Sequence, residues 1–142
     1  MATTTYSTDG AGLGTTPTTK LNGGVVGGRL RRFRARFTFA AQADGDTIVL
    51  FNVPAGHVFA FGIVNASATF GASATIAIGI SGATGKYRTA ATHTATVPTL
   101  FGLTTAADDE ATTAEETILL TIATAALPGS GTAVVDMYFS AP

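Results

Sequence analysis

The sequence predicts an all-β protein: an antiparallel β-sandwich or jelly roll of about eight strands, with an extended N-terminal arm. From Arg29 onward, apolar residues recur at strand spacing between Gly, Pro and Asp turns, and no helical segment intervenes. Residues 1–28 are mostly Thr, Gly, Ala and Ser, a composition that cannot form a core. We therefore expect an arm at 1–28 and one domain at 29–142.

The first strand is expected at 29–41, where side chains alternate sharply in character. The aromatic face is predicted to point inward, because burying its rings is worth several kcal/mol, and it comprises Phe33, Ala35, Phe37 and Phe39. The opposite face comprises Arg32, Arg34, Arg36 and Thr38. Asp44-Gly45 is a typical hairpin signal after this strand.

The remaining strands are expected at 47–53, 58–70, 74–80, 97–103, 115–125 and 132–139. Residues 29–80 then form an up-and-down run of four strands, in which Phe59, Phe61 and Ile63 share one face. Residues 81–96 are predicted to be a long polar connection, 104–114 a second loop, and 127–131 a hairpin loop. Two long connections in the second half favour Greek-key crossings in a sandwich over the alternative, a closed up-and-down barrel.

Composition and charge restrict the class of protein. The 142 residues are 46% hydrophobic and only 12% charged, which argues against disorder of the whole chain. The absence of Cys excludes disulfides, thiol catalysis and Cys-ligated metals. The pattern predicts neither a membrane span nor a secretory signal. Residues 1–43 carry a net charge of +5 and residues 44–142 a net charge of −6, so one end of a subunit can attract the other end of a neighbour.

Residues that could support catalysis or metal binding are few. The two histidines, His57 and His93, have no Gly-x-Ser-x-Gly motif or other triad spacing near them, so we expect no enzyme activity and no cofactor. An acidic patch lacks the spacing of a calcium loop and comprises Asp108, Asp109, Glu110, Glu115 and Glu116. A solvated loop is its first interpretation, and a partner-facing patch or an ion site are the alternatives.

The sharpest local signal is an arginine stripe of Arg29, Arg31, Arg32, Arg34 and Arg36. Alternating arginines on a strand lie roughly 6.5–7 Å apart, a spacing that suits a row of carboxylates or phosphates. Because the rest of the domain is acidic, the stripe favours a protein partner or inter-subunit contact over a solvated face or nucleic acid. Val25 and Val26 form a short β-capable segment that could add to a neighbour's sheet, so these two valines and the stripe are the predicted protein interface.

Three segments together resemble small β-proteins of tailed bacteriophages. They are Phe51-Asn52-Val53-Pro54-Ala55-Gly56-His57-Val58, the run from Thr69 to Gly79, and Gly85-Lys86-Tyr87. The resemblance is to head decoration, or cement, proteins and covers roughly residues 47–90. It implies a jelly-roll subunit, often a trimer, that sits on the major capsid protein lattice and has no catalytic residues.

We therefore expect a non-enzymatic virion structural protein, made in the host cytoplasm and located on the capsid surface. Its expected partners are the major capsid protein and further copies of itself in a homotrimer, with no membrane and no nucleic acid. The alternative is a tail- or fibre-associated module that binds a host glycan. Trp is absent, and only Tyr87 and His93 in the long polar connection could serve such a module.

Overall fold

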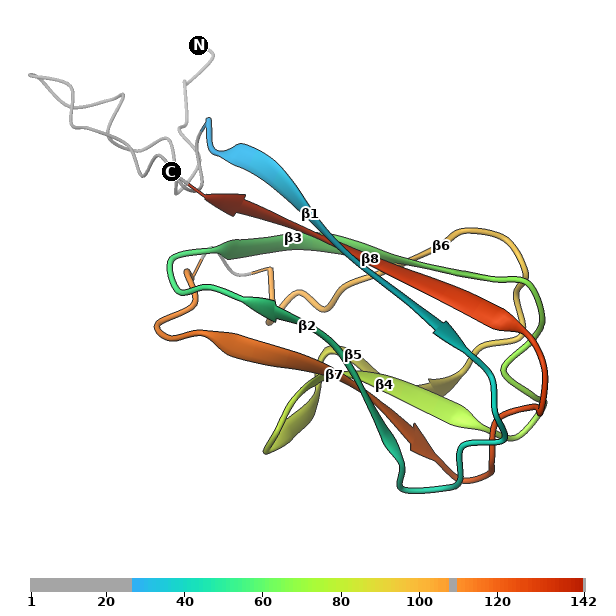
Figure 1. Cartoon of the computed structure of the whole chain (residues 1–142). Coiled ribbons are helices and arrows are strands. Elements are labelled where there is room, and N and C mark those ends of the chain that lie inside the picture. Colours follow the sequence, from blue (N-terminus) through green and yellow to red (C-terminus); the bar gives the residue numbers. More distant parts are fainter. Residues whose placement is uncertain (1–26, 108–109, 142) are drawn as a thin grey trace, which may run out of the picture.

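The structure is a computed structural model that describes residues 27–107 and 110–141. Two four-stranded antiparallel sheets pack face to face (Figure 1). The strands are β1 (Arg29–Thr38), β2 (Thr47–Val53), β3 (Val58–Ala66), β4 (Thr75–Ile80), β5 (Ala83–Thr92), β6 (Thr99–Phe101), β7 (Glu116–Ala123) and β8 (Thr132–Ala141). The described residues contain no helix, and the predicted all-β sandwich is confirmed.

The strand order is that of a jelly roll. One sheet has the order β1-β8-β3-β6 and the other β2-β7-β4-β5. The antiparallel pairs are nested, with β1 on β8, β2 on β7, β3 on β6 and β4 on β5, as in a long ribbon folded once and wound into two sheets. The strands β1 and β8 pair along their whole length. Arg29 at the start of β1 therefore lies beside Ala141 at the end of β8 (Figure 1).

The predicted up-and-down run over 29–80 is wrong. Successive strands from β1 to β4 alternate between the two sheets, and among described strands only β4 and β5 pair with their immediate sequence neighbour. The Asp44-Gly45 turn therefore joins the two sheets instead of closing a hairpin, and the 127–131 loop does the same. Asp44 accepts a hydrogen bond from the Thr124 amide at 3.0 Å, which ties the turn to the end of β7.

The long polar connection predicted at 81–96 is also wrong, because it contains β5. This strand lies at a sheet edge, and most of its side chains are exposed, with Tyr87 alone buried. An edge strand of this kind lacks the apolar alternation that identifies a half-buried strand. Gly82, at a φ of +81°, makes the tight turn from β4.

The core lies between the sheets and is rich in aromatic rings. Phe39 and Phe70 have ring centroids 4.8 Å apart, and Phe59 packs edge-to-face on Phe139 at 5.4 Å. Phe33 and Phe37 are half-buried against this cluster, which confirms the predicted inward face of the first strand.

A β-bulge in β3 changes which side chains face the core. The register against β8 shifts between Phe59 and Phe61, so Phe59 is buried while Phe61 and Ile63 point away from the core. The prediction that all three share one face is therefore wrong. Gly62 lies beneath the Phe101 ring on the core side of β3. A β-carbon added to Gly62 would lie only 2.2 Å from the nearest atom of that ring.

Candidate functional site

The predicted arginine stripe divides between the two faces of β1. Cross-strand neighbours share a face, and Arg32, Arg34 and Arg36 lie opposite Tyr138, Asp136 and Val134, outside the sandwich. Arg31 lies opposite Phe139 and Arg29 opposite Ala141, two residues that face the core. These two arginines therefore emerge on the other side of β1, where both are exposed. The prediction of one five-residue stripe is corrected to a row of three outward arginines, which we call the arginine row, with two further arginines at the end of the sandwich.

The middle arginine of the row is paired within the chain. Arg34 donates two hydrogen bonds to Asp136, from Nε to Oδ1 and from Nη2 to Oδ2, each at 2.7 Å. This bidentate geometry fixes both side chains on the outer face. The hydrogen bond from Arg34 lowers the pKa of Asp136 against the opposing effect of burial, and the charges of Arg32 and Arg36 act in the same direction as Arg34.

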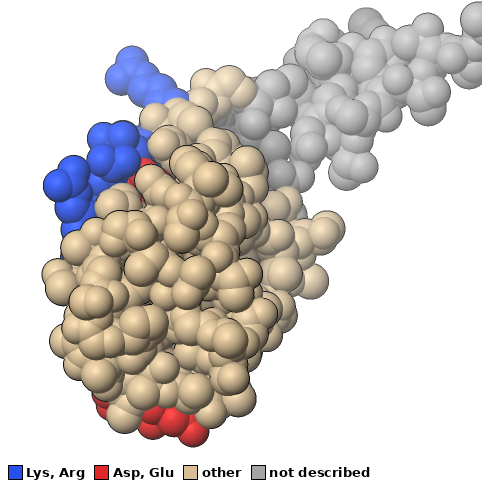
Figure 2. All heavy atoms as spheres, turned by 90° about the vertical axis from the view of Figure 1, so that its right-hand side faces the viewer, with Lys and Arg blue, Asp and Glu red and all other residues tan. Residues whose placement is uncertain are grey.

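The outer arginines of the row remain open. Both Arg32 and Arg36 are exposed, and across residues 27–107 and 110–141 neither has a hydrogen-bond or ion-pair partner. Figure 2 shows basic side chains gathered on one upper flank, with a small acidic area beside them, and a second acidic area at the opposite, lower end.

Apolar side chains continue the outer face beyond the arginine row. One row of paired residues crosses all four strands from Arg34 through Asp136 and Ile63 to Leu100. Leu100 is 71% exposed, and Phe61 stacks on Tyr138 with centroids 4.7 Å apart. The face therefore passes from cations on β1 to apolar groups on β3 and β6, which the sequence did not predict because of the bulge in β3.

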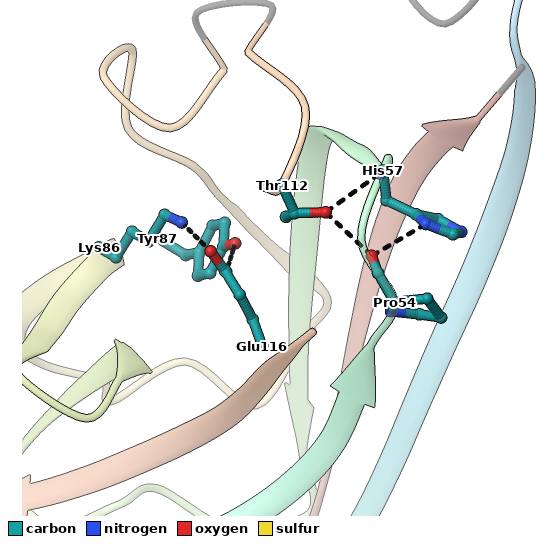
Figure 3. Close-up of polar contacts among 6 residues, drawn as sticks. All are labelled: Pro54, His57, Lys86, Tyr87, Thr112 and Glu116. Carbon is teal, nitrogen blue, oxygen red and sulfur yellow. Dashed lines mark hydrogen bonds and ion pairs between the residues drawn. The ribbon is translucent and has the colours of Figure 1, made fainter. Parts of the chain in front are cut away.

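A second candidate site is a pocket of about 240 Å³ lined by His57, Lys86, Tyr87, Glu110 and Glu116 among others. Glu116 accepts hydrogen bonds from the Tyr87 hydroxyl at 2.5 Å and from Lys86 (Figure 3). Burial, and then this bond, raise the pKa of the Tyr87 hydroxyl. The cluster fastens β5 to β7, because two donors on β5 hold one carboxylate on β7.

The His57 ring points away from this cluster (Figure 3). Its Nδ1 lies 3.1 Å from the Pro54 carbonyl oxygen, and its Nε2 is buried without a partner among the described residues. The Thr112 hydroxyl donates to the same Pro54 carbonyl at 2.9 Å and accepts from the His57 amide at 3.1 Å. These contacts fasten the loop before β7 to the turn between β2 and β3, which is a structural role.

The other proposed chemical groups do not come together. His93 is buried beside Phe70, and burial, with the charge of Arg88 second, lowers its pKa. Since Tyr87 and His93 are both buried, neither is on the surface to bind a glycan. The described part of the chain has no group of three or more acidic or His residues placed to hold a metal ion.

Parts of the predicted sites lie outside the described residues. Val25, Val26, Asp108 and Asp109 belong to this group. Glu116 turns toward Lys86, and Glu115 accepts a bond from Asn52 at 3.4 Å, so these two acids do not form one patch. Among the residues that the structure describes, no helix is long and apolar enough to cross a membrane.

Comparison with known proteins gives similarity of fold. No family model and no curated protein sequence matches the chain. A chain in the capsid of Ralstonia phage GP4 is similar with a TM-score of 0.64 and 18% identity, over 81% of this chain and 86% of that one. A chain in the capsid asymmetric unit of cyanophage Pam1 has a TM-score of 0.62 and 17% identity over the same shares. A chain in the acid-stable capsid of Helicobacter pylori bacteriophage KHP30 has a TM-score of 0.56 and 11% identity, over 80% and 94%. At these identities the shared property is the jelly-roll fold.

Proposed function

We propose that the protein is a non-enzymatic structural component of a phage virion, and more specifically a decoration subunit that binds and stabilises the major capsid protein lattice. The observation that supports the proposal is the fold similarity to chains in three phage capsids, which extends over at least 80% of this chain. Most of each matched chain is covered as well, so the similarity is to whole small subunits, not to an inserted domain of a larger one.

The proposed mechanism is mechanical. The sandwich covers a junction between lattice subunits, and the arginine row contacts carboxylates there. The arm at 1–28 orders on a neighbouring chain, and Val25 and Val26 add a short strand to its sheet, because ordering must be repaid by new backbone hydrogen bonds. In this proposal the subunit associates into homotrimers on the capsid surface after synthesis in the host cytoplasm.

The first test is co-sedimentation of the purified chain with empty heads of the phage or prophage that encodes it. We expect the protein to pellet with the heads at a fixed ratio to the major capsid protein, and analytical ultracentrifugation of the protein alone gives its oligomeric state. A chain that stays in the supernatant at low salt refutes the decoration role.

The second test removes the arm. A variant lacking residues 1–22 should keep the melting temperature of the domain and occupy heads less completely, because all eight strands begin at or after Arg29. Unchanged occupancy would show that the arm has no part in capsid binding.

A further inference from the structure

We infer that the whole outer face of the β1-β8-β3-β6 sheet is one docking surface for a protein that presents carboxylates beside apolar side chains. We call it the docking face. The inference deepens the proposed function, in which the partner is the capsid lattice. It adds to the arginine row an apolar half that comprises Phe61, Ile63, Leu100 and Tyr138.

The cationic half has two open charges with a fixed separation. Arg32 and Arg36 are four residues apart on one strand, which is roughly 13 Å at about 3.3 Å per residue. Between them lies the Arg34–Asp136 pair, which is neutral overall. A matching partner therefore places carboxylates on either side of this pair.

The apolar half is continuous with the cationic half. Ile63 and Leu100 lie directly opposite each other on β3 and β6, and Ile63 also lies opposite Asp136. Single exposed apolar residues are normal on protein surfaces, whereas contiguous ones mark interaction sites. A shallow hollow joins the halves, and it is lined by Arg34, Arg36, Ile63, Asn65, Pro98, Val134 and Asp136.

A protein fits this face better than nucleic acid does. No residue of β8, β3 or β6 is Lys or Arg, so three of the four strands of this face offer no cation to a phosphate backbone. Base stacking needs free aromatic rings, but Phe61 and Tyr138 already stack on one another. Leu100 and Ile63 are groups that pack against apolar protein side chains.

A second copy of the chain does not supply the required chemistry. Two docking faces opposed would offer each other no unpaired carboxylate, because Asp136 is already held by Arg34. The outward residues of β2 and β7 on the other sheet pair as Thr47 with Thr121, Val49 with Leu119 and Asn52 with Thr117, and none has a carboxylate. Asp44 and Asp46 hold backbone amides of their own loop and its neighbour. Neither the docking face nor the outer face of β2 and β7 complements the docking face, and the occupant that we propose is a different protein.

The test that does not depend on phage heads is nuclear magnetic resonance mapping on the full isotope-labelled chain. The probes are a synthetic peptide of alternating Glu and Leu, a matched peptide of alternating Glu and Ser, and an oligothymidylate of equal charge. We expect the Glu-Leu peptide to shift amide signals of β1, β8, β3 and β6, with at least several-fold weaker binding of the Glu-Ser peptide. Stronger binding of the oligothymidylate, equal binding of the two peptides, or shifts elsewhere would overturn the inference.

Matched variants then separate the two halves in binding to heads. Leu100→Ser should weaken binding by about tenfold or more at every salt concentration, as expected for loss of one buried leucine contact, while Val49→Ser, at 64% exposure on the other sheet, should not. R32S/R36S should weaken binding at low salt and flatten its salt dependence. R29S/R31S removes the same charge from the other side of β1 and should have the smaller effect.

Equal losses from R32S/R36S and R29S/R31S, or from Leu100→Ser and Val49→Ser, would overturn the docking face while leaving the decoration role intact. If the Glu-Leu peptide shifts amide signals of the docking face but the chain does not bind heads, the decoration role would be refuted and the docking face supported. Melting temperatures of the four variants show whether each one is folded.

Discussion

Gly62→Ala should destabilise the domain through one defined contact. The new methyl group would meet three atoms of the Phe101 ring at 2.2, 2.5 and 2.6 Å, far inside normal contact distance. Phe101 belongs to the three-residue strand β6, so the ring must move out and take the strand with it. Overpacking of this kind typically costs about 1–3 kcal/mol.

The assay is equilibrium unfolding in urea, with the melting temperature as a second measure. For a domain of this size, a loss of about 1–3 kcal/mol lowers the melting temperature by several degrees. Gly129→Ala is the matched control, because nothing lies within 4 Å of its added methyl group and its φ is not in the left-handed region. The control should be neutral or slightly stabilising, since it restricts the unfolded chain.

The double variant Gly62→Ala with Phe101→Ala isolates the contact. Removing the ring makes room for the methyl group, so the double variant should be more stable than the sum of the two single losses predicts, by about 1 kcal/mol or more. A loss below about 0.5 kcal/mol for Gly62→Ala, or strictly additive losses, would refute the assigned packing of β6 on β3.

Three other changes test the polar contacts. Glu116→Gln weakens the bond from Tyr87 and should lower the free energy of unfolding by about 1–2 kcal/mol, measured in urea at pH 7. Burial lowers the pKa of His93, so on acidification the histidine takes up a proton in the unfolded chain before it does so in the folded one. The free energy of unfolding should therefore fall as pH drops below about 6.5. The melting temperature of His93→Asn should fall less over the same pH range. The pKa of Asp136 is lowered by Arg34, so its contribution is present above the unfolded pKa of about 4 and is lost as pH falls through the lower folded value. Asp136→Asn should therefore be less stable at pH 7 and lose less stability on acidification, and an unchanged acid limb in urea titrations would contradict this.

The fold class could be predicted from the sequence, because the alternation of apolar and polar residues indicates strands with one buried face and the Gly, Pro and Asp residues indicate the turns between them. The first strand illustrates this: its inward aromatic residues and outward arginines follow from a period of two, and the register with β8 agrees. Pairing partners were not predictable in the same way. Asp44-Gly45 has the chemistry of a hairpin turn, yet it crosses between sheets, because nested long-range pairing decides which strands meet.

The docking face was only half visible in the sequence for a related reason. A single extra residue at the bulge reverses the side on which Phe61 and Ile63 emerge, and the nearest glycine, Gly62, lies just after the register shift. Gly62 is a plausible bulge marker, but its function is to accept the Phe101 ring. Likewise, the adjacent residues Arg31 and Arg32 lie on opposite faces of one strand, so the five arginines could not form a single stripe.

The jelly-roll topology also relates the two proposed capsid contacts to one another. The chain enters the domain at Arg29, beside Ala141 and at the end of the strand that carries the arginine row. An arm and a docking face on one chain act as a bivalent ligand, and such linkage can raise affinity by about 10²–10⁴ over either contact alone. Removing residues 1–22 or changing Arg32 and Arg36 to Ser should each abolish most of that gain, because each variant then binds mainly through the other contact; the combined variant, in which both contacts are impaired, should bind heads more weakly than either single variant. Single variants that bind heads nearly as well as the full chain, with a large loss only in the combined variant, would mean that the arm and the docking face do not engage the lattice at the same time.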